Sequence, residues 1–443
     1  MFPNKSSYIR QFSSISNVVL NRSKKTLAQK LLQSSSTTKA AKSEILQHLN
    51  LDYKRSTSLY FNWLFNNPKK LLTKYEDSLL NSLKLSESVK FSKGTVAGLH
   101  QLYFRNESKN KDLDPQISTP TVLIHGFAAS GVFYHRNFPE LTSKFTHLYT
   151  LDMPSVGLSD SFDLKDVQRI KYDFKLDSKT GEYQITWKDK AKAKESIAKV
   201  EDYYVERIEQ WRIANKIERF NLVSHSFGGL ISSKYCQKYP ERVAKLALIS
   251  PVGVEKSVFS INNSTISGFV QSSHPQLETY YKPSLIPSMI LKFGFSITKI
   301  MGPFGINLIS RYLSMRYARN STNVQQIDDF IHYTIILFYQ RSNSLRNLTT
   351  LLNNRLLALN PIMDSVDKLQ MPLLFMYGQY DWMNSKAGYL AAMKVNQKTL
   401  NSTTTSGVVK DQAQFKIIPN SGHNVFLDNP VAFNEEIVEF LKE

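Results

Sequence analysis

A serine in a turn of small residues is the first candidate for chemistry in this 443-residue chain. Ser226 stands in the run Ser224-His-Ser-Phe-Gly-Gly229, between an apolar segment typical of a buried strand and a segment with a helical pattern. A strand–turn–helix of this kind exposes the central hydroxyl, and its backbones approach so closely that small residues are needed two before and two after the serine. Gly228 meets this requirement, and Ser224 is small enough to stand where glycine is usual. We therefore predict that Ser226 is a nucleophile.

A serine hydroxyl is a weak nucleophile and requires a base that is oriented by an acid. In a strand–turn–helix site the acid and the base follow the serine along the chain, the acid first. Asp381 lies just past a predicted strand that ends at Tyr377-Gly378, and His423 lies just past another that ends at Pro419. Both positions are at the carboxyl ends of strands, where such sites assemble. We predict a triad of Ser226, His423 and Asp381.

Acyl transfer also needs backbone N–H groups that stabilise the developing oxyanion. Phe227, directly after the serine, is predicted to supply one of them. The second is predicted at Phe127, in the small-residue loop His125-Gly-Phe-Ala-Ala-Ser-Gly131. We expect His125 to shape this loop and not to act as a base.

His423 and Asp428 form an H-x4-D pattern, which is linked to glycerolipid acyl transfer. The pattern is short enough to occur in many chains by chance, and the triad already uses the histidine. Asp428 therefore has two interpretations, an independent catalytic role or a cap for the last helix near Asn429-Pro430. No cofactor and no metal are expected, because the chain has one cysteine and no Walker loop.

The elements that position these residues alternate between strands and helices. Strands are expected at 97–104, 120–124, 148–152, 220–224, 244–250, 372–377 and 415–419, and helices at 56–84, 201–216, after Ser226, and 431–442. This alternation predicts a mostly parallel central sheet with helices on both faces. Three stretches interrupt it: a polar surface insertion at 161–200 with a turn at Gly181, an apolar and aromatic insertion at 256–360, and a flexible loop at 398–412.

Basic residues dominate the chain, whose formal net charge is +19. Eight of them precede Glu44, the first acidic residue, in a stretch that also holds ten serines. This composition is typical of a mitochondrial transit peptide, predicted over residues 1–43, with an unaddressed basic tail as the alternative. No segment reaches the roughly 18 consecutive apolar residues of a transmembrane helix. No compact basic–aromatic motif favours a nucleic-acid partner.

The insertion at 256–360 has the composition of a segment that lies on an anionic bilayer. Between Lys256 and Gln326 seven basic residues stand against one acidic residue, Glu278, and aromatic and aliphatic side chains lie between them. Apolar anchors with interspersed cations suit a membrane interface. We expect peripheral contact with an anionic membrane through this insertion. The alternative is an ordinary cap, packed on the core, with a solvated basic face.

These motifs together resemble the α/β-hydrolase superfamily. Within it the chain is similar to the ABHD4/ABHD5-like lipid hydrolases, especially the fungal mitochondrial branch that includes the cardiolipin-specific deacylase. The resemblance runs from about residue 66 to the end. Besides the triad motifs it rests on Asp152-Met-Pro-Ser-Val-Gly-Leu-Ser159, Gly302-Pro-Phe-Gly305 and Tyr377-Gly-Gln-Tyr-Asp-Trp-Met383. Ser155 and Ser224 depart from the family pattern, because glycine is usual at both positions.

The resemblance implies an α/β-hydrolase fold whose core is formed by residues 44–255 and 361–443, with a helical cap at 256–360. It also implies a serine carboxylic-ester hydrolase of the phospholipase A type, which deacylates cardiolipin to monolysocardiolipin through an acyl-enzyme on Ser226. One alternative is an acyltransferase that uses acyl-CoA to acylate a lysophospholipid or lysophosphatidic acid. Another is a non-catalytic lipid-surface coactivator, which the presence of Ser226 disfavours. The expected location is the matrix side of the mitochondrial inner membrane.

Overall fold

The computed structural model describes residues 46, 49–108, 117–162, 164, 167–177, 179–264, 267–269, 295–317, 323–340, 342–402 and 412–442. The predicted transit peptide therefore lies outside the described residues. So do residues 270–294 of the predicted cap and residues 403–411 of the predicted flexible loop. The first part of that loop prediction is wrong, because helix α15 continues to Ser402.

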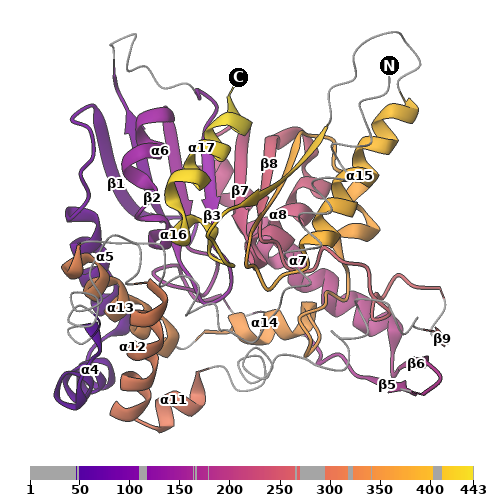
Figure 1. The fold of residues 1–443 in the computed structure, drawn as a ribbon, viewed down its shortest axis with the longest axis horizontal. Helices are drawn as coiled ribbons and strands as arrows, with labels where there is room; N and C mark the ends of the chain where they lie inside the picture. Colours follow the sequence, from indigo (N-terminus) through magenta and orange to yellow (C-terminus); the bar gives the residue numbers. More distant parts are fainter. Residues whose placement is uncertain are drawn as a thin grey trace.

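An eight-stranded sheet with the order β1-β2-β4-β3-β7-β8-β10-β11 forms the centre of the molecule (Figure 1). Its strands are β1 (Val89–Val96), β2 (Leu99–Asn106), β3 (Thr121–Ile124), β4 (His147–Leu151), β7 (Phe220–His225), β8 (Val243–Ile249), β10 (Leu373–Gly378) and β11 (Ala413–Ile418). β2 is antiparallel to both β1 and β4, and every pair from β4 to β11 is parallel. The mostly parallel sheet predicted from the sequence is confirmed.

The strand predicted at 97–104 is corrected to a hairpin of two strands. Ala97 and Gly98 have φ angles of 48° and 82° and form the turn between β1 and β2. The sequence did not predict β1, because this edge strand exposes most of its side chains and carries few of the apolar residues that mark a buried strand.

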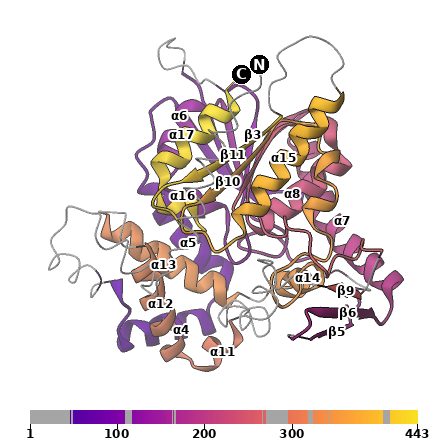
Figure 2. The ribbon, with the colours of Figure 1, turned by 45° about the vertical axis from the view of Figure 1, so that its right-hand side comes forward.

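Helices cover both faces of the sheet, as predicted (Figures 1 and 2). One face carries α6 (Phe138–Lys144) and α17 (Pro430–Leu441), and the other carries α7 (Lys190–Ala214), α8 (Phe227–Lys238) and α15 (Ser385–Ser402). Successive side chains of a strand point to opposite faces. In β3, Val122 and Ile124 accordingly join the core under α7 and α8, whereas Leu123 joins the core under α6 and α17.

The polar stretch at 161–200, predicted as a surface insertion, contains a β-hairpin and the first part of helix α7, which its composition did not predict. β5 (Tyr172–Leu176) and β6 (Glu182–Trp187) form a hairpin with Gly181 at its turn, and β6 also pairs with β9 (Ser267–Phe269). α7 begins eleven residues before the predicted start at 201, with the Asp189 side chain capping its N-terminus. Single-turn helices lie in other connections: η1 (Gly131–Tyr134), η2 (Pro240–Arg242), η4 (Ile362–Asp364) and η5 (Val366–Lys368).

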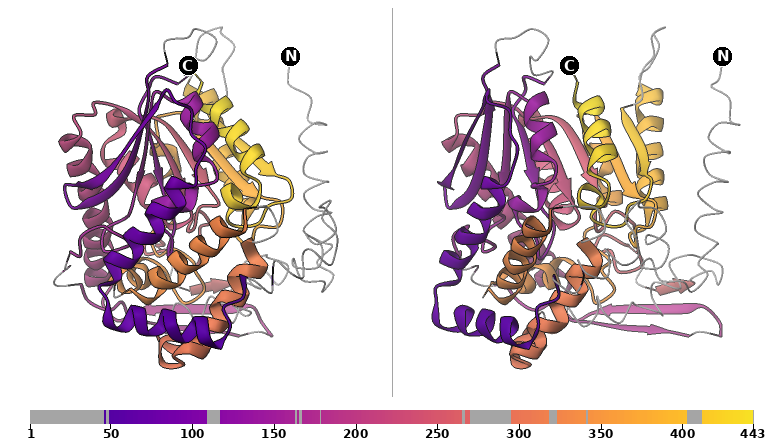
Figure 3. Two further views of the ribbon diagram at one scale, coloured as in Figure 1. Left: turned by 90° about the vertical axis from the view of Figure 1, so that its left-hand side faces the viewer. Right: turned by 60° about the vertical axis from the view of Figure 1, so that its left-hand side comes forward.

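A further group of helices lies beyond one end of the central sheet (Figures 2 and 3). α11 (Ser296–Ile300), α12 (Pro303–Tyr317), α13 (Val324–Tyr339) and α14 (Ser344–Leu351) come from the insertion at 256–360. α4 (Tyr53–Phe65) and α5 (Pro68–Asn81) precede the sheet in the sequence but pack against α12 and α13. Within the part of the chain that the structure describes, no helix is both long and apolar enough to span a bilayer.

The segment before α4 is also fixed to α12. Leu49 and Leu51 are buried. The Leu51 N–H donates to Ser310 Oγ at 3.2 Å, and the Leu51 carbonyl accepts a hydrogen bond from the Asn307 side chain. This segment is therefore part of the packed body of the cap.

Candidate active site

The turn between β7 and α8 holds Ser226 in a strained conformation. Its φ is 51° and its ψ is −113°, a region that residues with a Cβ rarely adopt. A Cβ at Gly228 would lie 2.5 Å from the His125 carbonyl oxygen, so only glycine fits where α8 meets the end of β3. Ser224, which stands where glycine is usual, directs its hydroxyl to Ser232 Oγ at 2.6 Å.

The three predicted triad residues lie in one chain of hydrogen bonds. Asp381, after β10, and His423, after β11, come from neighbouring parallel strands, and Ser226 follows β7. Asp381 Oδ1 is 3.1 Å from His423 Nδ1, and His423 Nε2 is 3.1 Å from Ser226 Oγ. The arrangement can therefore take a proton from the serine hydroxyl onto His423, while Asp381 stabilises the imidazolium that forms.

The environment of Asp381 keeps its carboxyl group ionised. Burial alone would raise the pKa of Asp381. The adjacent His423 and the hydrogen bonds to the carboxylate, including that from the Met383 N–H to Oδ1 at 3.0 Å, together hold the pKa of Asp381 below its usual range. The half-exposed Trp382 ring lies 4.7 Å from the His423 ring.

The loop after β3 lies against the nucleophile. A Cβ at Gly126 would come within 2.9 Å of Ser226 Cβ, so the loop that carries Phe127 passes directly beside the serine. His125 fixes the start of this loop: its Nδ1 donates to the Gly126 carbonyl at 2.7 Å, and its Nε2 accepts from the Met153 N–H at 2.9 Å. Burial lowers the pKa of His125 to about 4, so it is neutral and shapes the loop.

The other predicted oxyanion donor, Phe227, is the first residue of α8. Its N–H is among those at the start of a helix that have no partner within the helix, and the helix dipole favours negative charge there. Phe127, in the loop beside the serine, and Phe227, directly after it, are therefore both near Ser226. That their N–H groups stabilise a developing oxyanion stays a prediction.

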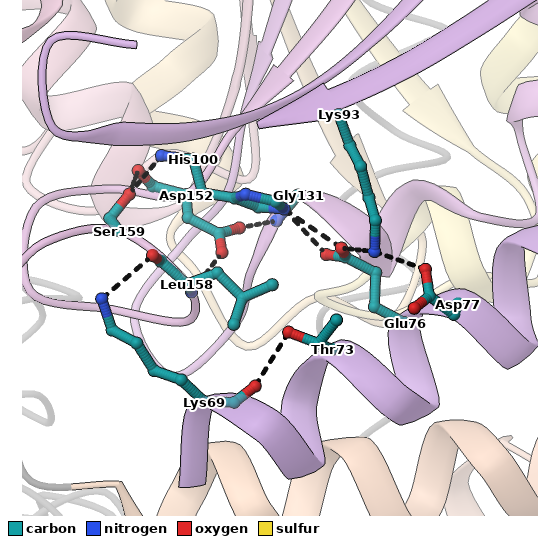
Figure 4. Close-up of polar contacts among 10 residues, drawn as sticks. All are labelled: Lys69, Thr73, Glu76, Asp77, Lys93, His100, Gly131, Asp152, Leu158 and Ser159. Atoms are coloured by element: carbon teal, nitrogen blue, oxygen red, sulfur yellow. Dashed lines mark hydrogen bonds and ion pairs between the residues drawn. The ribbon is translucent and has the colours of Figure 1, made fainter. Parts of the chain in front are cut away.

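A buried charge network holds the far end of this loop (Figure 4). Asp152, after β4, accepts the N–H of Gly131 at 2.7 Å and that of Leu158 at 2.8 Å. Nearby, His100 Nε2 lies 3.1 Å from both carboxylate oxygens of Glu76, a buried residue of α5 that also pairs with Lys93. The network thus links the N-terminal helix α5 to the loop that carries Phe127.

Protonation of His100 is expected to stabilise the fold. Burial alone would lower its pKa, but the Glu76 carboxylate and the charge of Asp152 raise it above 6.5. A His100→Gln variant should therefore be less stable than the wild type at about pH 5.5, and the difference should shrink as the pH rises through the native pKa. The free energy of unfolding in urea at several pH values measures this difference.

His147→Gln is the matched control, because burial lowers the pKa of His147. The advantage of the wild type over this variant should instead grow as the pH rises through about 6.5. Parallel pH profiles for the two variants would contradict the assignment of a raised pKa to His100.

Asp428 does not cap the last helix. The side chain of Asn429 caps α17 instead, accepting the N–H of Ala432 at 3.2 Å. Asp428 accepts the N–H of Gly422 on Oδ2 at 2.8 Å, and Arg316 of α12 binds both of its carboxylate oxygens. The aspartate of the H-x4-D pattern therefore lies between the cap and the loop of His423.

His225 is a further member of the site whose contact the sequence did not predict. Its Nε2 donates to the carbonyl oxygen of His423 at 3.0 Å, and burial, reinforced by the charge of His423, lowers its pKa well below 6.5. His225, the residue before the nucleophile, is therefore neutral, and its side chain is hydrogen-bonded to the backbone of His423, the base. In the described part of the chain, no group of three or more His, Cys, Asp or Glu side chains could hold a metal ion.

A family model described as the alpha/beta hydrolase fold matches residues 119–430, which is most of the chain. The chain belongs to the α/β-hydrolase fold family. Among its members, protein ECM18 of Saccharomyces cerevisiae is 35% identical, over 85% of this chain and 82% of its own length. The yeast 1-acylglycerol-3-phosphate O-acyltransferase ICT1 is 33% identical, over 79% of this chain and 87% of its own.

More distant members of the family include human ABHD5, also named as a 1-acylglycerol-3-phosphate O-acyltransferase. It is 24% identical, over 80% of this chain and 83% of its own length. Similar solved structures include a bacterial membrane phospholipase A, with a TM-score of 0.48 and 16% identity over 85% of this chain and 92% of that one. The family model and the sequence relatives confirm the resemblance to ABHD4/ABHD5-like α/β-hydrolases.

Proposed function

We propose that this protein is a serine-dependent acyl hydrolase that acts on phospholipids at a membrane surface. The observation that carries the chemistry is the hydrogen-bonded chain from Asp381 through His423 to Ser226. Ser226 Oγ attacks the ester carbonyl while His423 Nε2 takes its proton. The same histidine then protonates the departing lysolipid oxygen. Water, activated by His423, hydrolyses the acyl-enzyme and releases the fatty acid.

The outer surface of the cap supports a lipid substrate. Phe304, Leu308 and Met315 form a stripe along α12, with 65%, 55% and 51% of their surfaces exposed. Exposed apolar side chains continue this surface onto the neighbouring helices: Tyr53, Phe61, Leu64 and Phe65 of α4 and Ile300 of α11. The rings of Tyr53 and Phe304 lie 5.3 Å apart, so the two helices form one apolar surface. We call these eight residues the outer cap face.

The charge around the outer cap face favours an anionic bilayer. The helices α4, α11 and α12 contain no aspartate or glutamate. Lys54 and Arg311 are exposed on α4 and α12, and Lys299 is on α11. Each cation near an anionic membrane contributes about 1 kcal/mol, and an extended apolar surface of this kind is typical of proteins that bind lipid.

A Phe304→Ser/Leu308→Ser variant is expected to bind vesicles that contain anionic phospholipid at least about tenfold more weakly than the wild type. Burial of one such side chain contributes about 1.5–3 kcal/mol, and about 1.4 kcal/mol corresponds to a factor of ten. Cosedimentation with vesicles measures binding. Leu390→Ser/Met393→Ser on α15 is the control, because those side chains are also partly exposed but lie away from the cap. Equal losses for the two variants would exclude the outer cap face as the binding surface.

Cardiolipin is the phospholipid that we propose as substrate, with monolysocardiolipin as the product. The location that we propose is the matrix side of the mitochondrial inner membrane. The basic residues around the outer cap face suit a lipid with two phosphate groups, and the basic N-terminal sequence suits import. The test is to incubate the protein with vesicles containing cardiolipin or phosphatidylcholine, and to identify the products by mass spectrometry.

An acyltransferase is the second candidate function, since ICT1 and ABHD5 are named as 1-acylglycerol-3-phosphate O-acyltransferases. In this reaction Ser226 takes an acyl group from acyl-CoA, and the hydroxyl of a lysolipid replaces water as the acceptor. Labelled acyl-CoA and lysophosphatidic acid distinguish the two functions. Label in free fatty acid supports hydrolysis, whereas label in phosphatidic acid supports transfer. Unchanged function of a Ser226→Ala strain, in contrast, would favour a non-catalytic coactivator.

A further inference from the structure

The C-terminal end of cap helix α12 lies directly on the loop that carries the catalytic histidine. Arg316 binds Asp428 through both guanidinium Nη atoms, with Nη2 at 2.7 Å from Oδ2. Its neighbour Tyr317 accepts a hydrogen bond from Asn424 Nδ2 at 2.8 Å. Two consecutive cap residues therefore reach the short segment from His423 to Asp428.

These contacts hold the backbone on both sides of His423. Asp428 Oδ2 also accepts the N–H of Gly422, the residue before the histidine, at 2.8 Å. Asn424, bound to Tyr317, is the residue after it. The imidazole thus projects from a peptide segment that is fixed at each end by a chain of contacts leading to α12.

The ion pair between Arg316 and Asp428 is largely shielded from water. The exposed fractions of the two side chains are 16% and 4%. A paired and shielded aspartate is fixed more firmly than one at the surface. The charge of Arg136 also acts on Asp428, so loss of Arg316 would remove the partner that binds both carboxylate oxygens and leave only the more distant attraction of Arg136. This carboxylate would then reorient or take up water, and its hydrogen bond to Gly422 would be disturbed.

We propose that Arg316 and Asp428 are positioning residues for His423, so that the catalytic histidine is correctly placed only while α12 is seated on its loop. The inference rests on the proposed function, because it takes Ser226 and His423 as the reacting pair. His423 Nε2 is 3.1 Å from Ser226 Oγ, close to the limit for a hydrogen bond. A displacement of the loop by about 1 Å would break this contact and can cost about 100-fold in rate.

This role differs from direct catalysis by Asp428. If Asp428 took part in the chemistry itself, its replacement would lower the rate, but loss of Arg316 would not. If Asp428 acts by connecting the His423 loop to Arg316 of the cap, loss of either Arg316 or Asp428 lowers the rate. The double variant is then no worse than the more damaging single variant, because both changes break the same contact.

The experiment compares Arg316→Met, Asp428→Asn, the double variant and Arg316→Lys in the full chain. A dissolved short-chain ester serves as substrate, so that membrane binding does not affect the rate. We expect a roughly 10- to 100-fold lower kcat for Arg316→Met, with KM within about twofold, and partial recovery in Arg316→Lys. The rate at which a fluorophosphonate labels Ser226 should fall in parallel, because labelling also needs His423.

Arg55→Met is the matched control, since Arg55 of α4 binds Asp328 of α13 at 2.6 Å inside the same group of helices. It tests whether any loosening of the cap lowers kcat. The proposal is overturned if Arg316→Met keeps full kcat, if only Asp428→Asn lowers it, or if Arg55→Met lowers it equally at a temperature where all variants are folded. Failure of the proposed function itself looks different: the wild type would not be labelled, and Ser226→Ala would not change turnover.

Discussion

Replacement of Ser226 by alanine is expected to lower the kcat for ester hydrolysis by about 10⁵- to 10⁶-fold, the scale found when a serine hydrolase loses its nucleophile. Oγ of Ser226 is the atom that His423 Nε2 contacts, so its removal leaves the base without a proton to take. No acyl-enzyme can then form. Turnover of a dissolved ester and fatty-acid release from vesicles both measure the loss.

Ser233→Ala is the control for this change. Ser233 belongs to α8, the helix that follows Ser226, is also buried, and donates its hydroxyl to the Leu230 carbonyl at 2.7 Å. It should keep nearly full activity, because the loss of one such hydrogen bond costs only about 1 kcal/mol of stability. Mass spectrometry after rapid quenching should find the acyl group on the peptide with Ser226 in the wild type and in Ser233→Ala, but no acyl group there in Ser226→Ala. Normal turnover by Ser226→Ala would exclude the serine mechanism.

An Asp381→Asn variant is expected to lose about 10⁴-fold in kcat, as serine proteases do when the orienting aspartate becomes an amide. The carboxylate accepts the proton of His423 Nδ1 and so presents Nε2 as an acceptor to Ser226. An asparagine can instead donate to Nδ1, which favours the tautomer in which Nε2 carries the proton. That tautomer cannot act as a base.

The pH dependence of this variant follows from the lowered pKa of Asp381. Because the native pKa of Asp381 lies below the usual one, the folded state favours the ionised carboxylate. The contribution of this carboxylate to stability is fully present above the unfolded pKa of about 3.9. It is lost as the pH falls through the native pKa. Asp381 therefore stays ionised in the wild type between about pH 6 and pH 8, so its own titration adds no pH dependence to the loss of kcat in this range. Asp367→Asn, which removes a partly exposed partner of Lys394, is the control. A kcat for Asp381→Asn within tenfold of the wild type would show that another group orients His423.

The sequence predicted the central strands and the triad for physical reasons. Strands such as β3 and β10 are buried along their whole length and consist almost entirely of apolar residues. In a parallel sheet their carboxyl ends meet at one edge, so residues that follow separate strands can be placed together without knowing any distance. The exposed β1 and the polar hairpin of β5 and β6 have no such signal, and composition alone described them poorly.

Contacts between distant segments could not be predicted. Arg316 and Asp428 are 112 positions apart, and nothing in the residue types of α12 indicates which carboxylate it meets. Ser224 is a local example of the same limit. Ser224 stands where glycine is usual, and its hydroxyl is hydrogen-bonded to that of Ser232 at 2.6 Å. Ser232 lies on α8 and reaches Ser224 only when α8 packs against β7, so the sequence alone does not show this contact.

The attachment of the segment before α4 limits how the N-terminus can be processed. Leu49 and Leu51 are buried, and both backbone groups of Leu51 bind side chains of α12. An import protease that cut after this segment would remove a support of the helix that also carries Arg316. If the proposed leader at residues 1–43 is removed on import, a cut that keeps the cap intact is therefore expected before Leu49, where the packed segment begins.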